Sequence, residues 1–188
     1  LRQYPAADSA ANRFIALSPT NPRGVLRKAM AAIGRGDLAG ARAAVRAGAQ
    51  RIDPNALFSY LATYYDLYWV LDDDQQRQVL ALPPSAYGDD RATWGIVRAQ
   101  IYHLRGDRTQ TMIYADSARI GFLEHIKGAP DDPQQHVFLG LALAYLGRAA
   151  EAEQEGRRGV ELGGDDASVV PYFRHQLVRI YLATGQPE

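Results

Sequence analysis

Small residues recur at fixed distances along this chain, and their spacing limits the possible folds more than any other feature of the sequence. In three places a small residue is followed by a second after 12 positions and by a third after 7 more. Two helices of a hairpin can approach closely only where side chains are small, so this spacing predicts three helical hairpins. The three sets are Ala29, Ala41 and Gly48; Ala99, Thr111 and Ala118; Gly140, Ala152 and Gly159.

Each set encloses a glycine at which we expect the hairpin to turn. These glycines are Gly36, Gly106 and Gly147, and Gly185 ends a further helical stretch in the same way. Two of the turns contain Arg-Gly-Asp, at 35–37 and 105–107, a tripeptide known as a cell-adhesion ligand. We interpret both as structural turns, in which glycine supplies backbone freedom and aspartate begins the next helix.

The same stretch, GRGDLAG, does not fit a dinucleotide-binding loop. Its glycines are spaced G-x-G-x-x-x-G, and no strand-like segment precedes them.

Helix-capping residues give independent boundaries for the expected helices. Asp132 precedes Pro133, which favours a helix start, and Asp72 is followed three residues later by Gln75, a capping-box pattern. The acidic pairs at 89–90 and 165–166 are expected to begin helices as well. We predict an all-α chain with roughly ten helices and no strand.

These residues resemble the tetratricopeptide repeat, a helix-turn-helix unit of about 34 residues. The best copy spans 133–162, where the Leu139-Gly140 pair, the Gly147 turn, Ala152 and Gly159 match the family pattern. Partial repeats are expected at both ends, from Tyr4, Ala7 and Pro19 at the start and from 171–185 at the end. The repeat is degenerate around 55–84, and Val25 and His136 replace the aromatic residue expected early in the first helix.

The resemblance implies a single domain over 1–188, a right-handed superhelix (α-solenoid) of about five stacked repeats. The first helix of each repeat would line a concave wall that binds a peptide or helix of a partner protein. On this register the wall comprises Met30, Ile96, Gln100, Val137, Leu141, Tyr145, His175 and Arg179. Chaperone-docking members of the family grip a terminal carboxylate with polar wall residues, but this wall has Leu26, Met30, Val137 and Leu141 at matching positions.

The later part of this wall, around Val137, Leu141, Tyr145, His175 and Arg179, is the expected partner site. It mixes apolar, aromatic and cationic groups, as interface anchors do. The alternative is that this end packs on a further hairpin after Glu188.

Tyrosines at 60, 64 and 68 form an i, i+4, i+8 series, with Tyr65 and Trp69 beside it. We expect these residues to lie along one helix. The stripe is either core packing between hairpins or an exposed partner-binding surface.

Several function classes lack residues to support them. The chain has 21 basic and 21 acidic residues, so no overall charge favours nucleic acid, although residues 1–50 hold eight basic and two acidic residues. There is no cysteine, the four histidines are scattered, and Asp72 to Asp74 is better explained as a helix cap than as a metal site. No nucleophile motif is present, so we expect no enzyme activity, cofactor or metal.

The longest uncharged apolar run, 137–147, has 11 residues, fewer than the about 20 that a membrane helix needs. No signal peptide is recognised, and a cytoplasmic location is expected. Three functions compete: a protein-interaction scaffold, a ligand-sensing module of a bacterial signalling kinase or transcriptional regulator, and an RNA-binding helical repeat. The scaffold is favoured, as an excised segment of a larger, bacterial protein.

Overall fold

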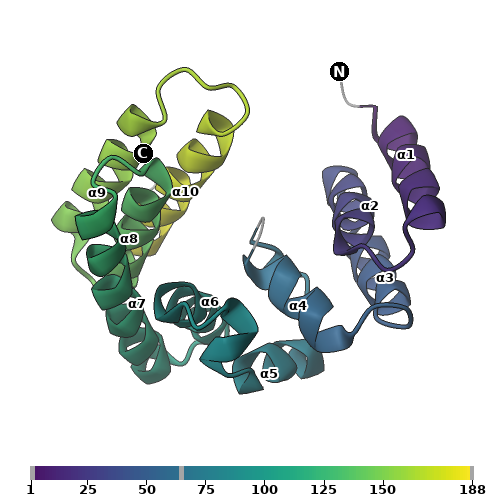
Figure 1. Cartoon of the computed structure of the whole chain (residues 1–188), viewed down its shortest axis with the longest axis horizontal. Coiled ribbons are helices and arrows are strands. Elements are labelled where there is room, and N and C mark those ends of the chain that lie inside the picture. Colours follow the sequence, from purple (N-terminus) through teal and green to yellow (C-terminus); the bar gives the residue numbers. More distant parts are fainter. Residues whose placement is uncertain (1–2, 64–65, 187–188) are drawn as a thin grey trace. The chain divides into compact units, whose positions relative to one another are not determined.

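The computed structural model of the chain describes residues 3–63 and 66–186. Within these ranges it contains ten α-helices and two short 3-10 helices and no strand, which confirms the predicted all-α class and helix number (Figure 1). The α-helices are α1 (Tyr4–Leu17), α2 (Pro22–Gly34), α3 (Leu38–Gly48), α4 (Pro54–Thr63), α5 (Asp73–Ala81), α6 (Arg91–Leu104), α7 (Arg108–Gly128), α8 (Pro133–Tyr145), α9 (Ala149–Leu162) and α10 (Val170–Thr184). The 3-10 helices are η1 (Leu67–Trp69) and η2 (Pro84–Tyr87).

The contacts divide the chain into two compact units, Leu1–Ala86 and Tyr87–Glu188. In the first unit, α2 packs against both α1 and α3, and α4 packs against α5 and η1. In the second unit, α6 packs against α7, and α8 packs against α7, α9 and α10. A single domain over 1–188 and a superhelix of about five repeats both stay predictions.

The four predicted turn glycines all adopt the left-handed backbone conformation, which confirms the joints. Their φ angles are 77° at Gly36, 74° at Gly106, 77° at Gly147 and 72° at Gly185. At each joint the residue after the glycine donates its backbone N–H to the carbonyl five residues earlier, as Asp37 does to Ala32 over 3.0 Å. This pattern closes the end of a helix and favours glycine, which has no Cβ to clash there.

The Arg-Gly-Asp aspartates are helix caps, as expected. Asp37 accepts a hydrogen bond from the backbone N–H of Gly40 at 2.7 Å, and Asp107 accepts one from Gln110 at 3.0 Å. Each satisfies a donor that the first turn of a helix leaves without a partner in the helix.

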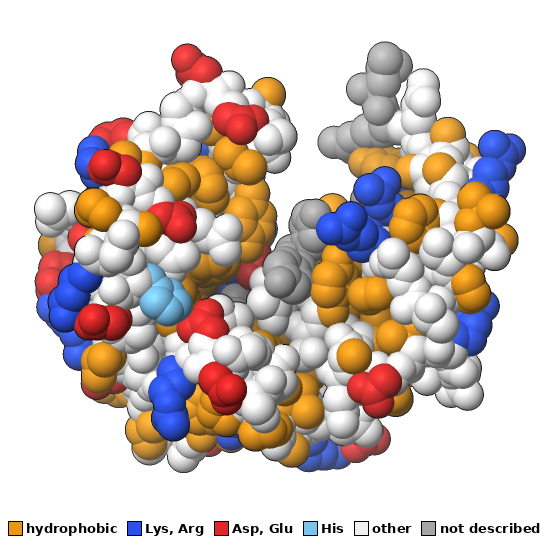
Figure 2. Space-filling view, viewed as in Figure 1, with side chains coloured by type: hydrophobic (Ala, Val, Ile, Leu, Met, Phe, Trp, Pro, Cys, Tyr) orange, Lys and Arg blue, Asp and Glu red, His pale blue; other side chains and the backbone are white. Residues whose placement is uncertain are grey.

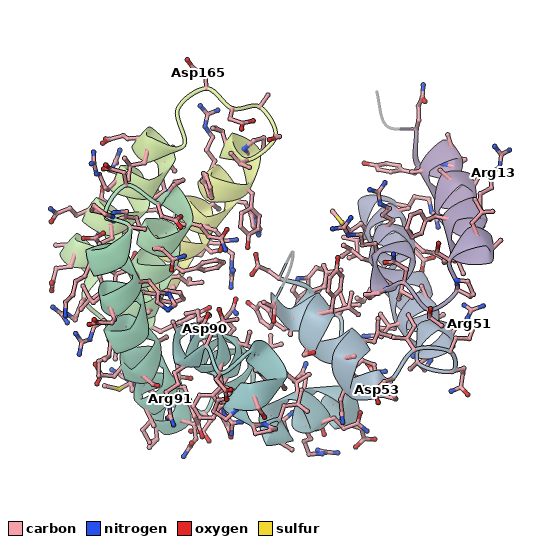
Figure 3. The ribbon with its side chains drawn as sticks, viewed as in Figure 1. Arg13, Arg51, Asp53, Asp90, Arg91 and Asp165 are labelled. Carbon is pink, nitrogen blue, oxygen red and sulfur yellow. The ribbon has the colours of Figure 1, made fainter. Side chains whose placement is uncertain are left out.

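Other predicted caps are confirmed, with one exception. Asp72 and Gln75 form the reciprocal capping box of α5, and Asp132 and Asp90 cap α8 and α6. The helix start predicted at 165–166 is wrong, because α10 begins only at Val170. Asp166 instead accepts bonds from the N–H and hydroxyl of Ser168, which form a local turn, and Asp165 lies at the tip of the α9–α10 loop (Figure 3).

The small residues mark close helix crossings, as the 12-and-7 spacing predicted, and all nine of them are buried. A Cβ placed on Gly140 in α8 would lie 2.8 Å from the carbonyl oxygen of Ala152 in α9. A Cβ on Gly159 would lie 2.7 Å from the carbonyl oxygen of Pro133. These distances leave no room for a side chain, so the two helices of this hairpin touch backbone to backbone.

The region predicted to be a degenerate repeat contains short helices. The prediction that the aromatic stripe lies along one helix is wrong, because α4 ends at Thr63 and Tyr68 and Trp69 belong to η1. Between them Asp66 has a φ of 57°, which no α-helix accommodates. Tyr64 and Tyr65 lie outside the described residues, and Tyr60 and Tyr68 are half-buried.

The core of the second unit is built from apolar side chains of α6 to α10, with Phe122 stacked on Phe138 at a ring-centre distance of 5.7 Å. His136 occupies the place of the missing aromatic residue at the start of α8. Its Nδ1 lies 2.6 Å from a carboxylate oxygen of Glu155, and its Nε2 lies 2.9 Å from the carbonyl oxygen of Pro130. The ring therefore ties the α7–α8 loop to α9.

Candidate functional site

The predicted wall residues of the second unit come from α6, α8 and α10, at matching distances before the three turn glycines. Gln100, Leu141 and Arg179 each precede the turn glycine of their helix by six residues. Ile96, Val137 and His175 each precede it by ten. The structure places these positions on α6, α8 and α10.

Three of the predicted residues meet in a hydrogen-bonded group that we name the Arg179 cluster, which comprises Gln100, Tyr145, Gln176 and Arg179. The guanidinium of Arg179 donates to the side-chain oxygen of Gln100 on α6 and, over 2.7 Å, to that of Gln176 on α10. It also lies 3.5 Å from the hydroxyl oxygen of Tyr145 on α8. Arginine can make these contacts together because its planar fork carries five donors.

Both glutamines of the Arg179 cluster are almost completely buried. Gln100 is 2% exposed and Gln176 is fully buried. A buried amide needs hydrogen-bond partners, so the guanidinium compensates for the burial of both oxygens. The cluster therefore fixes α6 and α10 to each other across 79 residues of sequence.

His103 extends the cluster towards the end of α6. Its ring packs against the ring of Tyr145 with their centres 4.8 Å apart and a tilt of 43° between their planes. Partial burial lowers the pKa of His103 below its usual value, and the nearby positive charge of Arg179 lowers the pKa further. Both effects favour the neutral form of the imidazole.

A pocket of about 380 Å³ opens beside His103 and Tyr145. It lies at the turn ends of the α6–α7 and α8–α9 hairpins, and Gly106 and Gly147 contribute to its wall. Thr111 and Ala144 form its buried side, while Arg108 and Met112 are exposed at its edge. The pocket is therefore open to solvent and has mixed polar and apolar walls.

Four of the predicted wall residues are not accessible to a partner. Val137 and Leu141 are fully buried, and Ile96 and Gln100 are no more than 3% exposed. Leu141 belongs to the apolar core of the second unit, together with Ile96 of α6 and Ile180 of α10. The prediction that these four residues lie on an open wall is therefore wrong. Their side chains belong to the buried interior of the second unit.

The other four predicted residues reach the surface. Tyr145 and Arg179 are half-buried, and His175 is exposed on α10. Met30, on α2, is 46% exposed but belongs to the first unit. Partner binding at these positions stays a prediction.

The sequence pattern missed His103 and Gln176. Gln176 is a polar residue within the apolar stripe of α10. Gln100 and Arg179 lie at the same distance from their turn glycines, which indicates that they occupy equivalent positions on α6 and α10. Together these features could have suggested a buried polar contact.

The described ranges contain no group of three or more His, Asp or Glu side chains placed to hold a metal ion. Within residues 3–63 and 66–186, no helix combines the length and the apolar character that crossing a membrane requires. Comparison with protein-family models, with curated proteins and with solved structures returned no match.

Proposed function

We propose that this chain is a non-catalytic protein-interaction module of the tetratricopeptide-repeat kind, which binds a segment of a partner protein on the second unit. The binding surface comprises Tyr145, His175 and Arg179 together with the pocket beside His103. The observation that carries this proposal is the grouping of Tyr145, His103 and Arg179 beside an open pocket. The ring of Tyr145 packs against the imidazole of His103, and its hydroxyl lies next to the guanidinium of Arg179. Tyrosine and arginine are the residues that most often anchor protein interfaces.

The shape of the pocket favours a partner segment over a small ligand. A volume of about 380 Å³ lies within the range of ligand pockets. However, His103, Gly106, Arg108, Met112 and Gly147 are all exposed around it, so a small molecule would remain largely in contact with water. A peptide side chain can enter such an open pocket while the rest of the peptide covers the neighbouring surface.

The proposal can be tested by site-specific photo-crosslinking. A benzophenone amino acid at position 175, which is exposed, should crosslink the partner in cells that express the full-length protein. The same amino acid at the exposed Glu161 of α9 serves as the control position. The crosslinked partner is identified by mass spectrometry, and its dissociation constant is then measured with purified proteins.

The double variant Tyr145→Ala with His175→Ala should weaken binding of this partner by about tenfold or more. Arg179 is left in place because it holds α6 and α10 together. Circular dichroism checks that the fold is retained. If the partner binds the double variant as tightly as it binds the unchanged protein, the second unit does not carry the binding site.

A further inference from the structure

The first unit contains an open groove formed by α1, α2 and α3, with a volume of about 600 Å³. Its inner surface is made of short or apolar side chains, and its edges carry cationic ones. Ala32 and Ala44 form the buried floor, and Ala43 and Ala47 are exposed along the α3 side. This groove lies within one compact unit and is separate from the surface proposed above.

The second unit contains a hairpin at matching sequence positions, and the groove beside it is much smaller. Gly147 follows Gly36 by 111 residues, and α8 (Pro133–Tyr145) follows α2 (Pro22–Gly34) by the same number at both ends. The equivalent groove, over α7, α8 and α9, has a volume of about 110 Å³. The turn and the bounds of the first helix match in the two hairpins, whereas the side chains along the two grooves differ.

The side chains that close the second groove have small or charged counterparts in the first. Leu139 and Leu143 on α8 correspond to Lys28 and Ala32 on α2. On the other wall, long side chains of α9 correspond to small residues of α3. Glu151 takes the place of Gly40, Gln154 that of Ala43 and Glu155 that of Ala44.

The first groove is also positively charged. Lys28, Arg35 and Arg51 line it, against a single carboxylate from Asp8. The amino group of Lys28 donates to the side-chain oxygen of Asn12 over 2.5 Å and so lies between α2 and α1. Figure 2 shows Lys and Arg side chains over α1 to α3, at the upper right, and few acidic side chains among them.

From this comparison we propose that the groove of α1, α2 and α3 binds an acidic peptide segment of a partner protein. Carboxylates of the peptide meet Lys28, Arg35 and Arg51, and a large apolar side chain enters between Ala32 and Ala44. Groove shape and charge are complementary to such a segment: the space left by alanine and glycine accepts the apolar group, and the cationic edge accepts the acidic groups. The inference does not depend on the function proposed for the second unit.

The apolar floor favours a peptide over a nucleic acid. Binding to a phosphate backbone needs a row of cations but not a cavity lined by alanine. Stacking of bases needs aromatic side chains, and the residues that line this groove include none. Ile15, Ala32 and Ala44 instead offer an apolar contact to an aliphatic or aromatic side chain.

The test begins with a phage-displayed library of random twelve-residue peptides, selected against the whole chain. Enriched peptides should combine Asp or Glu with Leu, Ile or Phe. Their dissociation constants are measured by fluorescence polarisation with labelled synthetic peptides. A labelled twelve-nucleotide poly-uridine RNA is measured in parallel.

Two variants test the groove, each with a matched control. The double variant Arg35→Glu with Arg51→Glu should weaken peptide binding by about tenfold or more. Its control is the double variant Arg13→Glu with Arg23→Glu, which changes the net charge by the same amount. Neither of these residues lines the groove, and Figure 3 shows that Arg13 points away from α2. Ala43→Leu should fill the groove and weaken binding similarly, whereas Ala39→Leu, on the same helix outside the groove, should not.

The proposal stands if both groove variants lose affinity for the selected peptides, both controls keep it, and all four remain folded. It is overturned if the enriched peptides are basic or lack apolar residues, or if the groove and control variants bind alike. It is also overturned if poly-uridine binds more tightly than every selected peptide and only the charge variants weaken it. Loss of binding at position 175 alone would concern the second unit and leave this groove unaffected.

Discussion

Replacing Gly140 by alanine should destabilise the second unit, although alanine normally stabilises a helix. The added Cβ would lie 2.8 Å from the carbonyl oxygen of Ala152 and 2.9 Å from the backbone nitrogen of Gly156. Both atoms belong to the backbone of α9, so they can retreat only if the whole helix moves. A third contact, to the Cδ1 atom of Ile180 at 2.8 Å, involves a side chain that can rotate.

Two opposing effects set the size of the change. Overpacking a close helix crossing costs about 1–3 kcal/mol. Exchanging glycine for alanine inside a helix contributes about 1 kcal/mol in favour of folding. At the middle of these ranges, the net loss in the free energy of unfolding should be about 1 kcal/mol. With a urea dependence of about 2 kcal/mol per molar, the unfolding midpoint should fall by roughly 0.5 M.

The matched control is Gly128→Ala at the end of α7, where a Cβ would meet no atom within 4 Å. This variant should be neutral or slightly more stable. Urea unfolding is followed by tryptophan fluorescence in a Trp69→Phe background, which leaves Trp94 of α6 as the single tryptophan. Trp94 packs edge-on against Tyr114 at 5.2 Å and therefore reports the second unit.

A midpoint for Gly140→Ala at or above that of Gly128→Ala would refute the reasoning. It would mean that α8 and α9 can separate at little cost, and that the 12-and-7 spacing does not report a tight crossing.

Asp107→Ala should lower thermal stability by about 1 kcal/mol, because the N–H of Gln110 loses its acceptor, while Asp107→Asn should retain most of it. Gly147→Ala should cost about 1 kcal/mol in urea unfolding, because the φ of 77° is unfavourable for a residue with a Cβ. His136→Ala should cost about 1–3 kcal/mol in the same assay, since the partly buried carboxylate of Glu155 loses its partner. The folded protein holds the pKa of His103 below its usual value of 6.5, so protonation of this ring favours the unfolded chain. The free energy of unfolding is therefore greatest above pH 6.5 and decreases as the pH falls from 6.5 through the lowered pKa of the folded state. Between pH 7 and pH 5 the unchanged protein should therefore lose more stability than His103→Gln, and equal losses would contradict the lowered pKa.

Turns, caps and crossings could be predicted from the sequence because each depends on a few neighbouring residues. Gly147 must adopt a positive φ to end α8, and Asp132 must cap its start, whatever surrounds them. The spacing of Gly140 and Ala152 was informative for a similar reason, since the geometry of a short hairpin fixes which residues face each other.

Features that depend on distant residues could not be predicted. Leu141 was expected on an open wall, but it is fully buried in the core that α6 to α10 form together, which no local pattern indicates. Likewise, the stripe of tyrosines has helical spacing, yet the chain leaves the helix before Asp66. In the first case periodicity placed Leu141 on a helix correctly but gave no information about the neighbouring helices, and in the second it did not detect the end of α4.

The α2–α3 and α8–α9 hairpins share one turn geometry, and α2 and α8 have equal lengths. Both hairpins begin with a proline at the first helical position, turn at a glycine with a φ of 77°, and resume a helix two residues later. Exchanging only the groove-facing side chains between the two hairpins would leave both glycine turns unchanged. Since the grooves differ about fivefold in volume and are lined from matching positions of α2 and α8, side-chain substitutions along such a hairpin can create or remove a binding groove.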